Sequence, residues 1–295
     1  MPESRYESRF KARSAELPSI LRTILADKAA RLQDSRRQIP QGDLQRLCRD
    51  QPPPRNFRHA LDARRQAAIS GAPAESNAGG TLDTTAIIAE FKRRSPSRGV
   101  IRPQFDLAEI HRAYERGGAD AYSVLTEEDH FGGSLGDLQV LRNMAELPLL
   151  RKDFLFDPYQ IYESRAAGAD AVLLIVAALE DRRLGELIAL SRELSMEALV
   201  EVHCAAELHR ALACGARLVG INNRDLHSFQ VDIAVSLELA GSLPGHVTGV
   251  SESGIRTPED IRLLRSAGIR AFLVGEHLLR AQDPEKELRR LKGSP

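Results

Sequence analysis

The sequence predicts an α/β fold, a (β/α)8 TIM barrel with an N-terminal helical extension. From Thr84 onward, short apolar runs alternate with amphipathic stretches, a pattern that indicates a parallel sheet covered by helices. A glycine motif that precedes an apolar run recurs about every fifty residues, which fits two βα units per repeat and eight strands in total. Residues 84–295 also have the length of one barrel, roughly 200 to 250 residues.

The N-terminal region is predicted to be helical, because residues 17–37 show the periodicity of an amphipathic helix. One face carries Ile20, Leu21, Ile24, Leu25 and Leu32, and the other carries Asp27, Lys28, Arg31 and Arg36. We expect the apolar face to dock on the barrel and the charged residues to face solvent. Residues 70–81 (SGAPAESNAGGT) have too few apolar groups to offset ordering entropy, which predicts a flexible loop. The predicted division is therefore extension and loop at 1–83 and barrel at 84–295, within one structural domain.

The barrel strands are predicted from apolar runs. These runs read AIIAEF, AYSVLT, LPLLRK, AVLLIV, ALVEVH, LVGIN, HVTGVSES and AFLVGE. The repeat glycines are Gly118, Gly168, Gly215 and Gly268, spaced 50, 47 and 53 residues apart. A glycine just past a helix end takes the left-handed conformation and lets a short loop enter the next strand.

Helix starts and the first βα turn agree with the barrel. Asp157-Pro158 and Thr257-Pro258 each place a capping residue before a proline at the first helical position. The competing dinucleotide-binding fold needs G-x-G-x-x-G in its first βα turn, and here that turn reads KRRSPSRGV.

Composition argues against several classes of protein. The 41 basic and 41 acidic residues balance, and aromatics are 5% with no Trp, so neither a basic patch nor a stacking platform for nucleic acid is expected. The longest apolar run, 171–179, is too short for a membrane span, which takes about 20 residues. The N-terminal residues lack the apolar stretch of a secretory signal, and the three cysteines form no CxxC pair, which suits a reducing compartment. We therefore expect a cytoplasmic protein without nucleic-acid or membrane partners.

Candidate catalytic residues lie where the predicted strands end, because barrel active sites form at the C-terminal ends of the strands. Glu90 and Lys92 are two apart in strand one and point to the same side. They fit either a structural ion pair or a functional pair at the mouth. Lys152 follows a buried run, and Glu201 lies within an apolar one. A lysine snorkelling at the rim remains the alternative, but together the two resemble an acid and base pair.

Small residues at the last two strand ends predict an anion site. Ser253, Gly254 and Gly275 would let backbone N–H groups approach a phosphate, which barrels often bind after strands seven and eight. The eight histidines show no metal-binding spacing, and His203 is predicted to be a satisfied wall residue. No Ser-His-Asp set falls at strand ends, so we expect neither a metal nor a serine nucleophile.

Six segments in order resemble the indole-3-glycerol phosphate synthase family, the barrel enzymes of tryptophan biosynthesis. They read AEFKRRSPSRGVI, SVLTEEDHFGGSLGDLQVLR, LLRKDFLFDPYQIYESRAAGADAVLLI, LVEVHCAAEL, GINNRDL and VSESGI. The resemblance covers Leu17 to about Leu291. It implies a carboxy-lyase that closes the ring of 1-(2-carboxyphenylamino)-1-deoxyribulose 5-phosphate to give indole-3-glycerol phosphate, carbon dioxide and water, without a metal or organic cofactor.

The resemblance also implies residue roles. Lys152 matches the general acid at the ketone, and Glu201 the carboxylate that stabilises the cationic intermediate and transfers protons. Glu90 and Lys92 would assist closure and dehydration, with the division of steps between Lys92 and Lys152 left open. The remaining matches are Ser95, Asn222 and Arg224 for the carboxylate or sugar hydroxyls, Phe131 and Phe154 for the aromatic ring, Ser253, Gly254, Gly275 and Glu276 for phosphate, and Glu252 at the mouth.

The family interpretation places the N-terminal helix across the barrel mouth, and it leaves two alternatives. A phosphoribosylanthranilate isomerase-like barrel would use a Cys and Asp pair at other strand ends, whereas strand one here ends in Glu90 and Lys92. A noncatalytic phosphosugar-binding protein would be expected to lose Lys152 or Glu201, and both are present. The expected partner is a small phosphorylated substrate, with other tryptophan-pathway enzymes as further candidates.

Overall fold

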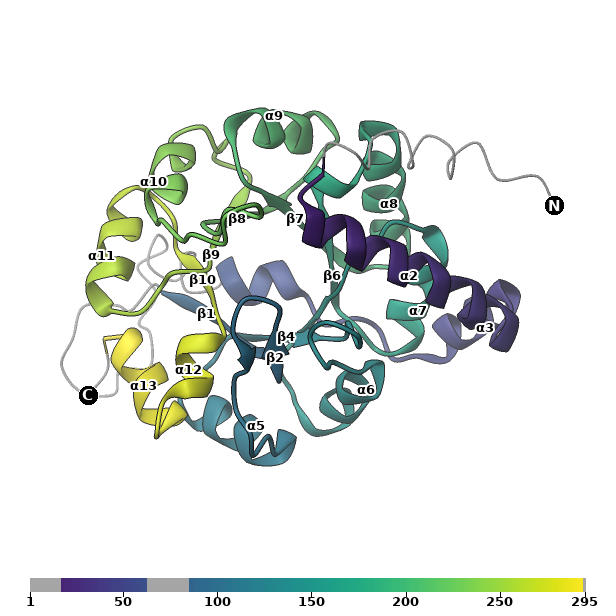
Figure 1. Cartoon of the computed structure of the whole chain (residues 1–295), viewed down its shortest axis with the longest axis horizontal. Helices are drawn as coiled ribbons and strands as arrows, with labels where there is room; N and C mark the ends of the chain where they lie inside the picture. The colour runs from purple at the N-terminus through teal and green to yellow at the C-terminus, as the bar shows by residue number, and fades with distance from the viewer. Residues whose placement is uncertain (1–16, 63–84, 294–295) are drawn as a thin grey trace.

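The computed structural model describes residues 17–62 and 85–293, and its centre is a closed barrel of eight parallel strands (Figure 1). The strands are β1 (Ala86–Phe91), β4 (Ala121–Leu125), β5 (Leu149–Lys152), β6 (Ala171–Ile175), β7 (Glu197–Val202), β8 (Leu218–Asn222), β9 (Thr248–Glu252) and β10 (Ala271–Val274). Each barrel strand pairs with the next along the chain, and β10 pairs with β1 to close the ring. All eight predicted strands, and with them the TIM-barrel fold, are confirmed.

A ring of helices surrounds the strands (Figure 1). They are α5 (Leu107–Arg116), α6 (Leu135–Met144), α7 (Pro158–Ala166), α8 (Asp181–Glu193), α9 (Ala205–Ala213), α10 (Ala234–Ala240), α11 (Pro258–Ser266) and α13 (Pro284–Leu291). Shorter elements follow three strand ends: the antiparallel pair β2 (Arg94–Ser95) and β3 (Gly99–Val100), the 3-10 turn η1 (Val176–Ala178), and α12 (Glu276–Arg280).

Local sequence determines where these elements begin and end. Asp157 and Thr257 each form a capping box at the start of α7 and α11, with a proline at the next position. The four repeat glycines, 118, 168, 215 and 268, have φ of +80°, +89°, +84° and +100°. These left-handed values are the ones predicted for a helix end that turns directly into a strand.

The core has two parts, one between strands and helices and one inside the barrel. Phe57 and Leu61 belong to the inner cluster and are almost fully buried. Nearby contacts tie this segment to the beginnings of strands, because Asp62 accepts a hydrogen bond from Thr248 and Arg58 lies 3.7 Å from Glu197. Residues 57–61 therefore close the end of the barrel opposite the strand C-termini.

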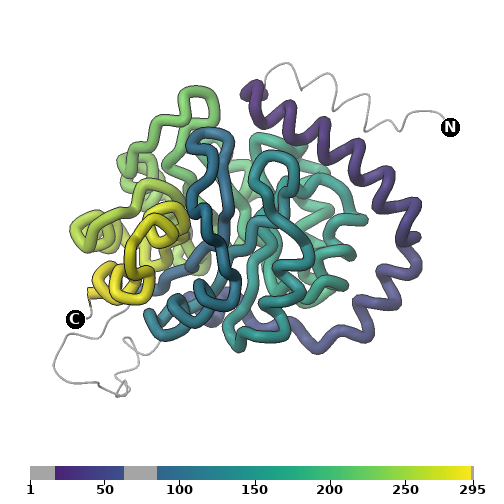
Figure 2. Tube along the Cα trace, turned by 60° about the horizontal axis from the view of Figure 1, so that its bottom comes forward, coloured from purple at the N-terminus to yellow at the C-terminus, as the bar shows by residue number. Residues whose placement is uncertain are grey.

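Two helices precede the barrel, α2 (Ser19–Gln38) and α3 (Gln41–Asp50). The predicted helix corresponds to α2, whereas α3, which packs on α7, was not predicted. Figures 1 and 2 show α2 lying along one side of the barrel and leading into α3. The predicted loop at 70–81 and the division between 83 and 84 lie outside the described residues.

The predicted outer face of α2 was wrong at one position. Lys28 is 8% exposed and lies on the same face as Leu21, Leu25 and Leu32, all of them buried. The spacing of these four positions is that of a stripe along one helix face. A buried cation needs a partner, and Lys28 has one in Asp153.

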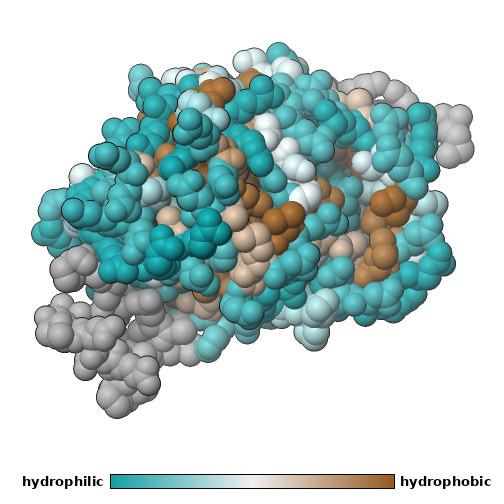
Figure 3. Space-filling model, turned by 90° about the horizontal axis from the view of Figure 1, so that it is seen from below, coloured by the Kyte–Doolittle hydropathy of each residue, from teal (hydrophilic) through white to brown (hydrophobic). Residues whose placement is uncertain are grey.

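The surface seen in Figure 3 is mostly hydrophilic, with apolar residues gathered in small groups. Within the described ranges, no helix has both the length and the apolar character needed to cross a membrane.

Candidate active site

A cavity of about 470 Å³ opens at the C-terminal ends of the strands. Side chains from all eight barrel strands or the residues just after them line it, and Ile20, Leu21 and Ile24 of α2 contribute to one wall. All fourteen residues predicted for the site line this one cavity: Glu90, Lys92, Ser95, Phe131, Lys152, Phe154, Glu201, Asn222, Arg224, Glu252, Ser253, Gly254, Gly275 and Glu276.

Lys152 lies between two carboxylates on the cavity floor. Its Nζ is 3.3 Å from Oε2 of Glu201 and 3.4 Å from Oε2 of Glu252, and all three side chains are at most 15% exposed. Three strands, β5, β7 and β9, bring these groups together. Barrel closure thus creates a cation held by two acids, which no single segment of the chain encodes.

Burial and charge drive the pKa values of these three groups apart. Burial alone would lower the pKa of Lys152, but Glu201, Glu252 and Glu90 outweigh it and raise that pKa, so the ammonium is retained. Burial raises the pKa of Glu252 to about 8, helped by the charges of Glu201 and Glu90. The pKa of Glu201 is instead lowered, because Lys152, His203 and Asn222 overcome its burial. Near neutral pH Lys152 therefore lies between one ionised carboxyl group, that of Glu201, and one protonated carboxyl group, that of Glu252.

Glu90 and Lys92 form a second charged pair at the end of β1. Lys92 Nζ lies 2.6 Å from Oε1 of Glu90, as their shared side of the strand predicts. Gly275 makes room for this carboxylate, since a Cβ at that position would lie 2.3 Å from Glu90 Oε1. The glycine thus serves the geometry of Glu90 as well as the predicted anion site.

Gly220 has the same relationship to Glu252. A Cβ on Gly220, in β8, would lie 2.0 Å from Oε1 of Glu252. This carboxyl group can point inward beside Lys152 only because β8 has no side chain there. The sequence analysis did not identify Gly220 as part of the site.

Two aromatic rings form an apolar wall. The centroids of Phe131 and Phe154 are 5.9 Å apart, at an interplanar angle of 37°. The backbone of the Phe131 loop is fixed by the buried carboxylate of Glu127, which accepts hydrogen bonds from the N–H groups of Asp129, His130 and Phe131.

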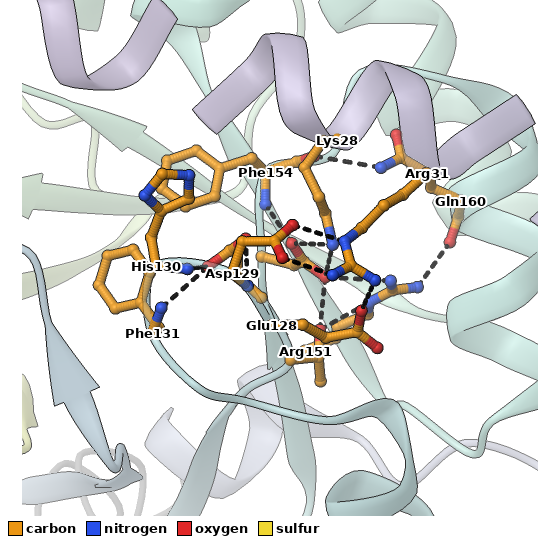
Figure 4. Close-up of polar contacts among 12 residues, drawn as sticks. Lys28, Arg31, Glu128, Asp129, His130, Phe131, Arg151, Phe154 and Gln160 are labelled. Atoms are coloured by element: carbon orange, nitrogen blue, oxygen red, sulfur yellow. Dashed lines mark hydrogen bonds and ion pairs between the residues drawn. The ribbon is translucent and has the colours of Figure 1, made fainter. Parts of the chain in front are cut away.

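Ion pairs hold helix α2 against the loop that carries Phe131 and against the end of β5. Figure 4 shows Lys28 and Arg31 pointing from α2 toward residues 128–131 and Arg151. Arg31 pairs with Glu128 and Asp129, and His130 Nε2 lies 2.8 Å from Asp27. Lys28 lies 2.8 Å from Asp153, which Arg151 also contacts at 3.0 Å. The helix, the Phe131 loop and the end of β5 are therefore joined by one network.

The residues predicted to bind an anion directly follow β9 and β10. Ser253 and Gly254 both have left-handed backbones, with φ of +66° and +87°, so the chain turns sharply after β9. Gly275 and Glu276 lead into α12 beside them. Arg98, Arg256 and Arg280 also line the cavity and were not predicted, because their loops have no strand-end pattern.

Ser95 and Asn222 complete the polar lining. In the described part of the chain, the buried Oγ of Ser95 has no hydrogen-bond partner, so it is free to bind a ligand. Asn222 accepts a hydrogen bond from the backbone N–H of Arg224. The residues described include no group of three or more His, Cys, Asp or Glu placed to hold a metal ion.

Comparisons with known proteins find relatives of this chain over most of its length. Residues 21–291 match the family described as indole-3-glycerol phosphate synthase. A protein of that name from Dehalococcoides mccartyi is 45% identical over 276 residues, which cover 92% of this chain and 99% of that protein.

Solved structures with low sequence identity share the fold alone. The 3-hexulose-6-phosphate synthase from Salmonella typhimurium has a TM-score of 0.57 at 14% identity, over 71% of this chain and 97% of its own. The thiamine phosphate pyrophosphorylase from Pyrococcus furiosus has a TM-score of 0.54 at 15% identity, over 72% and 95% respectively.

Proposed function

Because this chain belongs to the indole-3-glycerol phosphate synthase family, we propose how its residues carry out that family's reaction. The enzyme is a carboxy-lyase of tryptophan biosynthesis. It converts 1-(2-carboxyphenylamino)-1-deoxyribulose 5-phosphate into indole-3-glycerol phosphate, carbon dioxide and water. The observation that carries the assignment of roles is the ammonium of Lys152 held between Glu201 and Glu252 on the cavity floor.

Lys152 acts as the general acid at the substrate ketone. Ring closure moves negative charge onto the ketone oxygen while the aromatic ring carbon attacks the carbonyl carbon. A fixed cation in a site that excludes water stabilises this charge far better than it would in bulk solvent. The raised pKa of Lys152 supports this role, because the protonated form is the one that polarises the ketone.

Glu201 stabilises the cationic intermediate and receives protons. After the ring carbon attacks, positive charge develops on the anilino side of the substrate and is lost only when carbon dioxide leaves. The lowered pKa of Glu201 keeps its carboxylate ionised for this task. Glu252, with its pKa raised to about 8, retains a proton and can donate a hydrogen bond inside the cavity. Opposite shifts on two nearby carboxyl groups are typical of divided acid and base roles.

Glu90 and Lys92 assist ring closure and the loss of water. Their contact of 2.6 Å gives a proton donor and acceptor on the side of the cavity formed by β1. Lys92 also adds positive charge for the phosphate. Either lysine can deliver the proton that the departing hydroxyl requires, and the two assignments are separated by the variants described below.

Substrate binding divides between the two ends of the cavity. Phe131 and Phe154 contact the aromatic ring, and Ser95, Asn222 and Arg224 hold the carboxylate or the sugar hydroxyls. Ser253, Gly254, Gly275 and Glu276 bind the phosphate. The left-handed turn after β9 and the neighbouring arginines support this orientation.

The assignment of function is tested by turnover of the authentic substrate. Purified protein mixed with the carboxyphenylamino deoxyribulose phosphate should develop indole fluorescence. A lack of signal at high enzyme concentration would overturn the assignment. In a parallel assay with phosphoribosylanthranilate, consumption of that compound would instead indicate an isomerase. Binding of the carboxyphenylamino deoxyribulose phosphate without turnover would indicate a phosphosugar-binding protein.

We propose three further properties of the chain. The chain divides into an N-terminal region at 1–83 and a barrel at 84–295, and helix α2 of the N-terminal region helps to enclose substrate, which the cavity-lining residues of α2 support. The protein is cytoplasmic, as its three free cysteines suggest. Its partner is the phosphorylated substrate, with other enzymes of the tryptophan pathway as candidate neighbours and no role for nucleic acid or membrane.

A further inference from the structure

His203 lies directly behind Glu201, just after the end of β7. Its Nε2 is 3.5 Å from Oε1 of Glu201, while the other carboxylate oxygen, Oε2, faces Lys152 at 3.3 Å. Each carboxylate oxygen of Glu201 therefore has a nitrogen atom near it, Nε2 of His203 at Oε1 and Nζ of Lys152 at Oε2. His203 is not among the described residues that line the cavity. The imidazole therefore contacts the carboxylate from outside the space available to substrate.

Glu207, in the first turn of α9, fixes the orientation of this imidazole. Its Oε2 accepts a hydrogen bond from the backbone N–H of His203 at 2.8 Å and lies 3.1 Å from His203 Nδ1. The ring therefore stands between two carboxylates, one at each nitrogen. A neutral ring would direct a lone pair at one of them, whereas an imidazolium donates an N–H to both.

The Nε2 atom of His203 is not otherwise engaged. The His203 side chain is only 14% exposed, and within the described ranges Nε2 is buried without a hydrogen-bond partner. A buried donor without a partner is costly, and the 3.5 Å separation from Glu201 is an ion-pair distance that a small movement would tighten. Among the described residues, the hydrogen bonds predicted to satisfy His203 are therefore present at Nδ1 and absent at Nε2.

We propose that His203, anchored by Glu207, is a positioning residue that aligns the Glu201 carboxylate against Lys152 and keeps it ionised. This inference rests on the role proposed above for Glu201. The charged groups that face the imidazole are Glu201 on β7, Glu207 on α9 and Glu252 on β9. Lys152 on β5 lies on the far side of Glu201.

The electrostatics of His203 are consistent with this role. Burial lowers the pKa of its imidazole, but Glu207 and Glu201 outweigh burial and raise the pKa. The ring therefore keeps its proton to higher pH than a solvent-exposed histidine. Its charge in turn contributes to the lowered pKa of Glu201.

The test compares four variants of the full-length enzyme by steady-state kinetics between about pH 3.5 and 9. His203→Ala removes the imidazole ring, and His203→Gln replaces it with a neutral hydrogen-bond donor. Glu207→Gln keeps an oxygen that can accept a hydrogen bond from His203 but removes the negative charge of Glu207. His209→Ala is the matched control, because His209 is exposed on α9, the helix that carries Glu207. Thermal unfolding of each variant establishes that it is folded.

For His203→Ala we expect kcat to fall roughly tenfold with KM changed less than about twofold, since the residue acts through Glu201 and not on substrate. The acidic limb of the kcat/KM profile should move up by about one pH unit, because Glu201 loses a neighbouring cation and protonates more readily. His203→Gln should restore part of kcat but leave the limb displaced. Glu207→Gln should shift it in the same direction by less, and His209→Ala should match the wild type.

Wild-type kcat and an unmoved acidic limb in folded His203→Ala would overturn the inference. If that variant does not fold, unaltered profiles in both His203→Gln and Glu207→Gln would do the same. An NMR titration provides a readout that does not require turnover. The His203 imidazole should titrate at higher pH in the wild type than in Glu201→Gln, because Glu201 helps to raise its pKa, and an unchanged titration in Glu201→Gln would contradict the proposal. A wild-type enzyme without turnover but with these titrations would instead count against the proposed function.

Discussion

The ammonium of Lys28 lies 2.8 Å from a carboxylate oxygen of Asp153, the residue that follows Lys152 at the end of β5. The Asp153 side chain is fully buried and that of Lys28 is 9% exposed. Although burial opposes it, the cations of Lys28 and Arg151 hold the pKa of Asp153 at about 2. Asp153 also accepts a hydrogen bond from the backbone N–H of Phe154. One ion pair therefore connects α2 to both Lys152 and the aromatic wall.

Lys28→Met should destabilise the protein by roughly 3 kcal/mol, because removing one cation leaves the buried Asp153 carboxylate with less compensating charge. Turnover should fall as well, since the end of β5 loses its contact with α2. Urea unfolding measures the first effect and steady-state kinetics the second. Arg37→Met is the control, as the Arg37–Asp34 pair is 79% and 67% exposed and should contribute little. Equal effects of the two substitutions would contradict the prediction.

The strand ends could be predicted from the sequence because they depend on local pattern. A run of apolar residues followed by Glu, Lys or Asn identifies where a buried strand reaches the barrel mouth, and the repeat glycines determine the spacing of the strands. Lys28 could not be placed in this way. Its position falls in the apolar stripe of α2, but residue type favoured the solvent face, and only the partner Asp153, 125 residues away, accounts for its burial.

Contacts between strands also lie beyond local pattern. Gly220 belongs to the site because β9 directs Glu252 into the space that a Cβ would occupy, and this depends on the register of β8 against β9. The His203–Glu201 contact was missed for a related reason. An alternating strand pattern places both side chains on one side of β7 but does not reveal that Glu207 orients the ring toward the carboxylate.

Gly220→Ala should lower kcat about tenfold or more while changing KM little. The new methyl group cannot coexist with the observed Glu252 carboxyl group, so this group must rotate away from Lys152. Steady-state kinetics with the carboxyphenylamino deoxyribulose phosphate measures the effect. Gly241→Ala is the matched control, because a Cβ there meets nothing within 4 Å. Wild-type kcat in Gly220→Ala would mean that the position of Glu252 does not matter for turnover.

The raised pKa of Glu252 predicts how stability depends on pH. Below the unfolded-state pKa of 4.5, Glu252 is protonated in both states; between 4.5 and about 8, the unfolded chain releases a proton that the folded protein retains. The stability associated with this proton is therefore lost as the pH rises through about 8. Glu252→Gln stays neutral, so its free energy of unfolding relative to wild type should increase from pH 5 to pH 9.

The expected increase is at least about 1 kcal/mol, because each unit of pKa shift corresponds to about 1.4 kcal/mol. Urea unfolding of both proteins at the two pH values measures it, and contributions of other groups largely cancel in the difference. Glu238→Gln, at an exposed position on α10, should show no such change. A relative stability of Glu252→Gln that is constant with pH would mean that Glu252 is not buried as a neutral acid.

Lys152→Ala should reduce kcat by a factor of about 100 to 10,000 while leaving substrate binding largely intact. In the proposed binding mode the ring, carboxylate and phosphate contacts do not involve the Lys152 ammonium, whereas charge on the ketone oxygen would lose its stabilising cation. Isothermal titration measures binding, and indole fluorescence measures turnover. The same measurements on Lys92→Ala separate the two lysines: a general acid at the ketone loses kcat alone, while a phosphate contact raises KM. Lys286→Ala, on the exposed face of α13, controls for loss of positive charge. Near-normal turnover in Lys152→Ala would assign the acid role to Lys92, whose ammonium is the other one lining the cavity among the residues described.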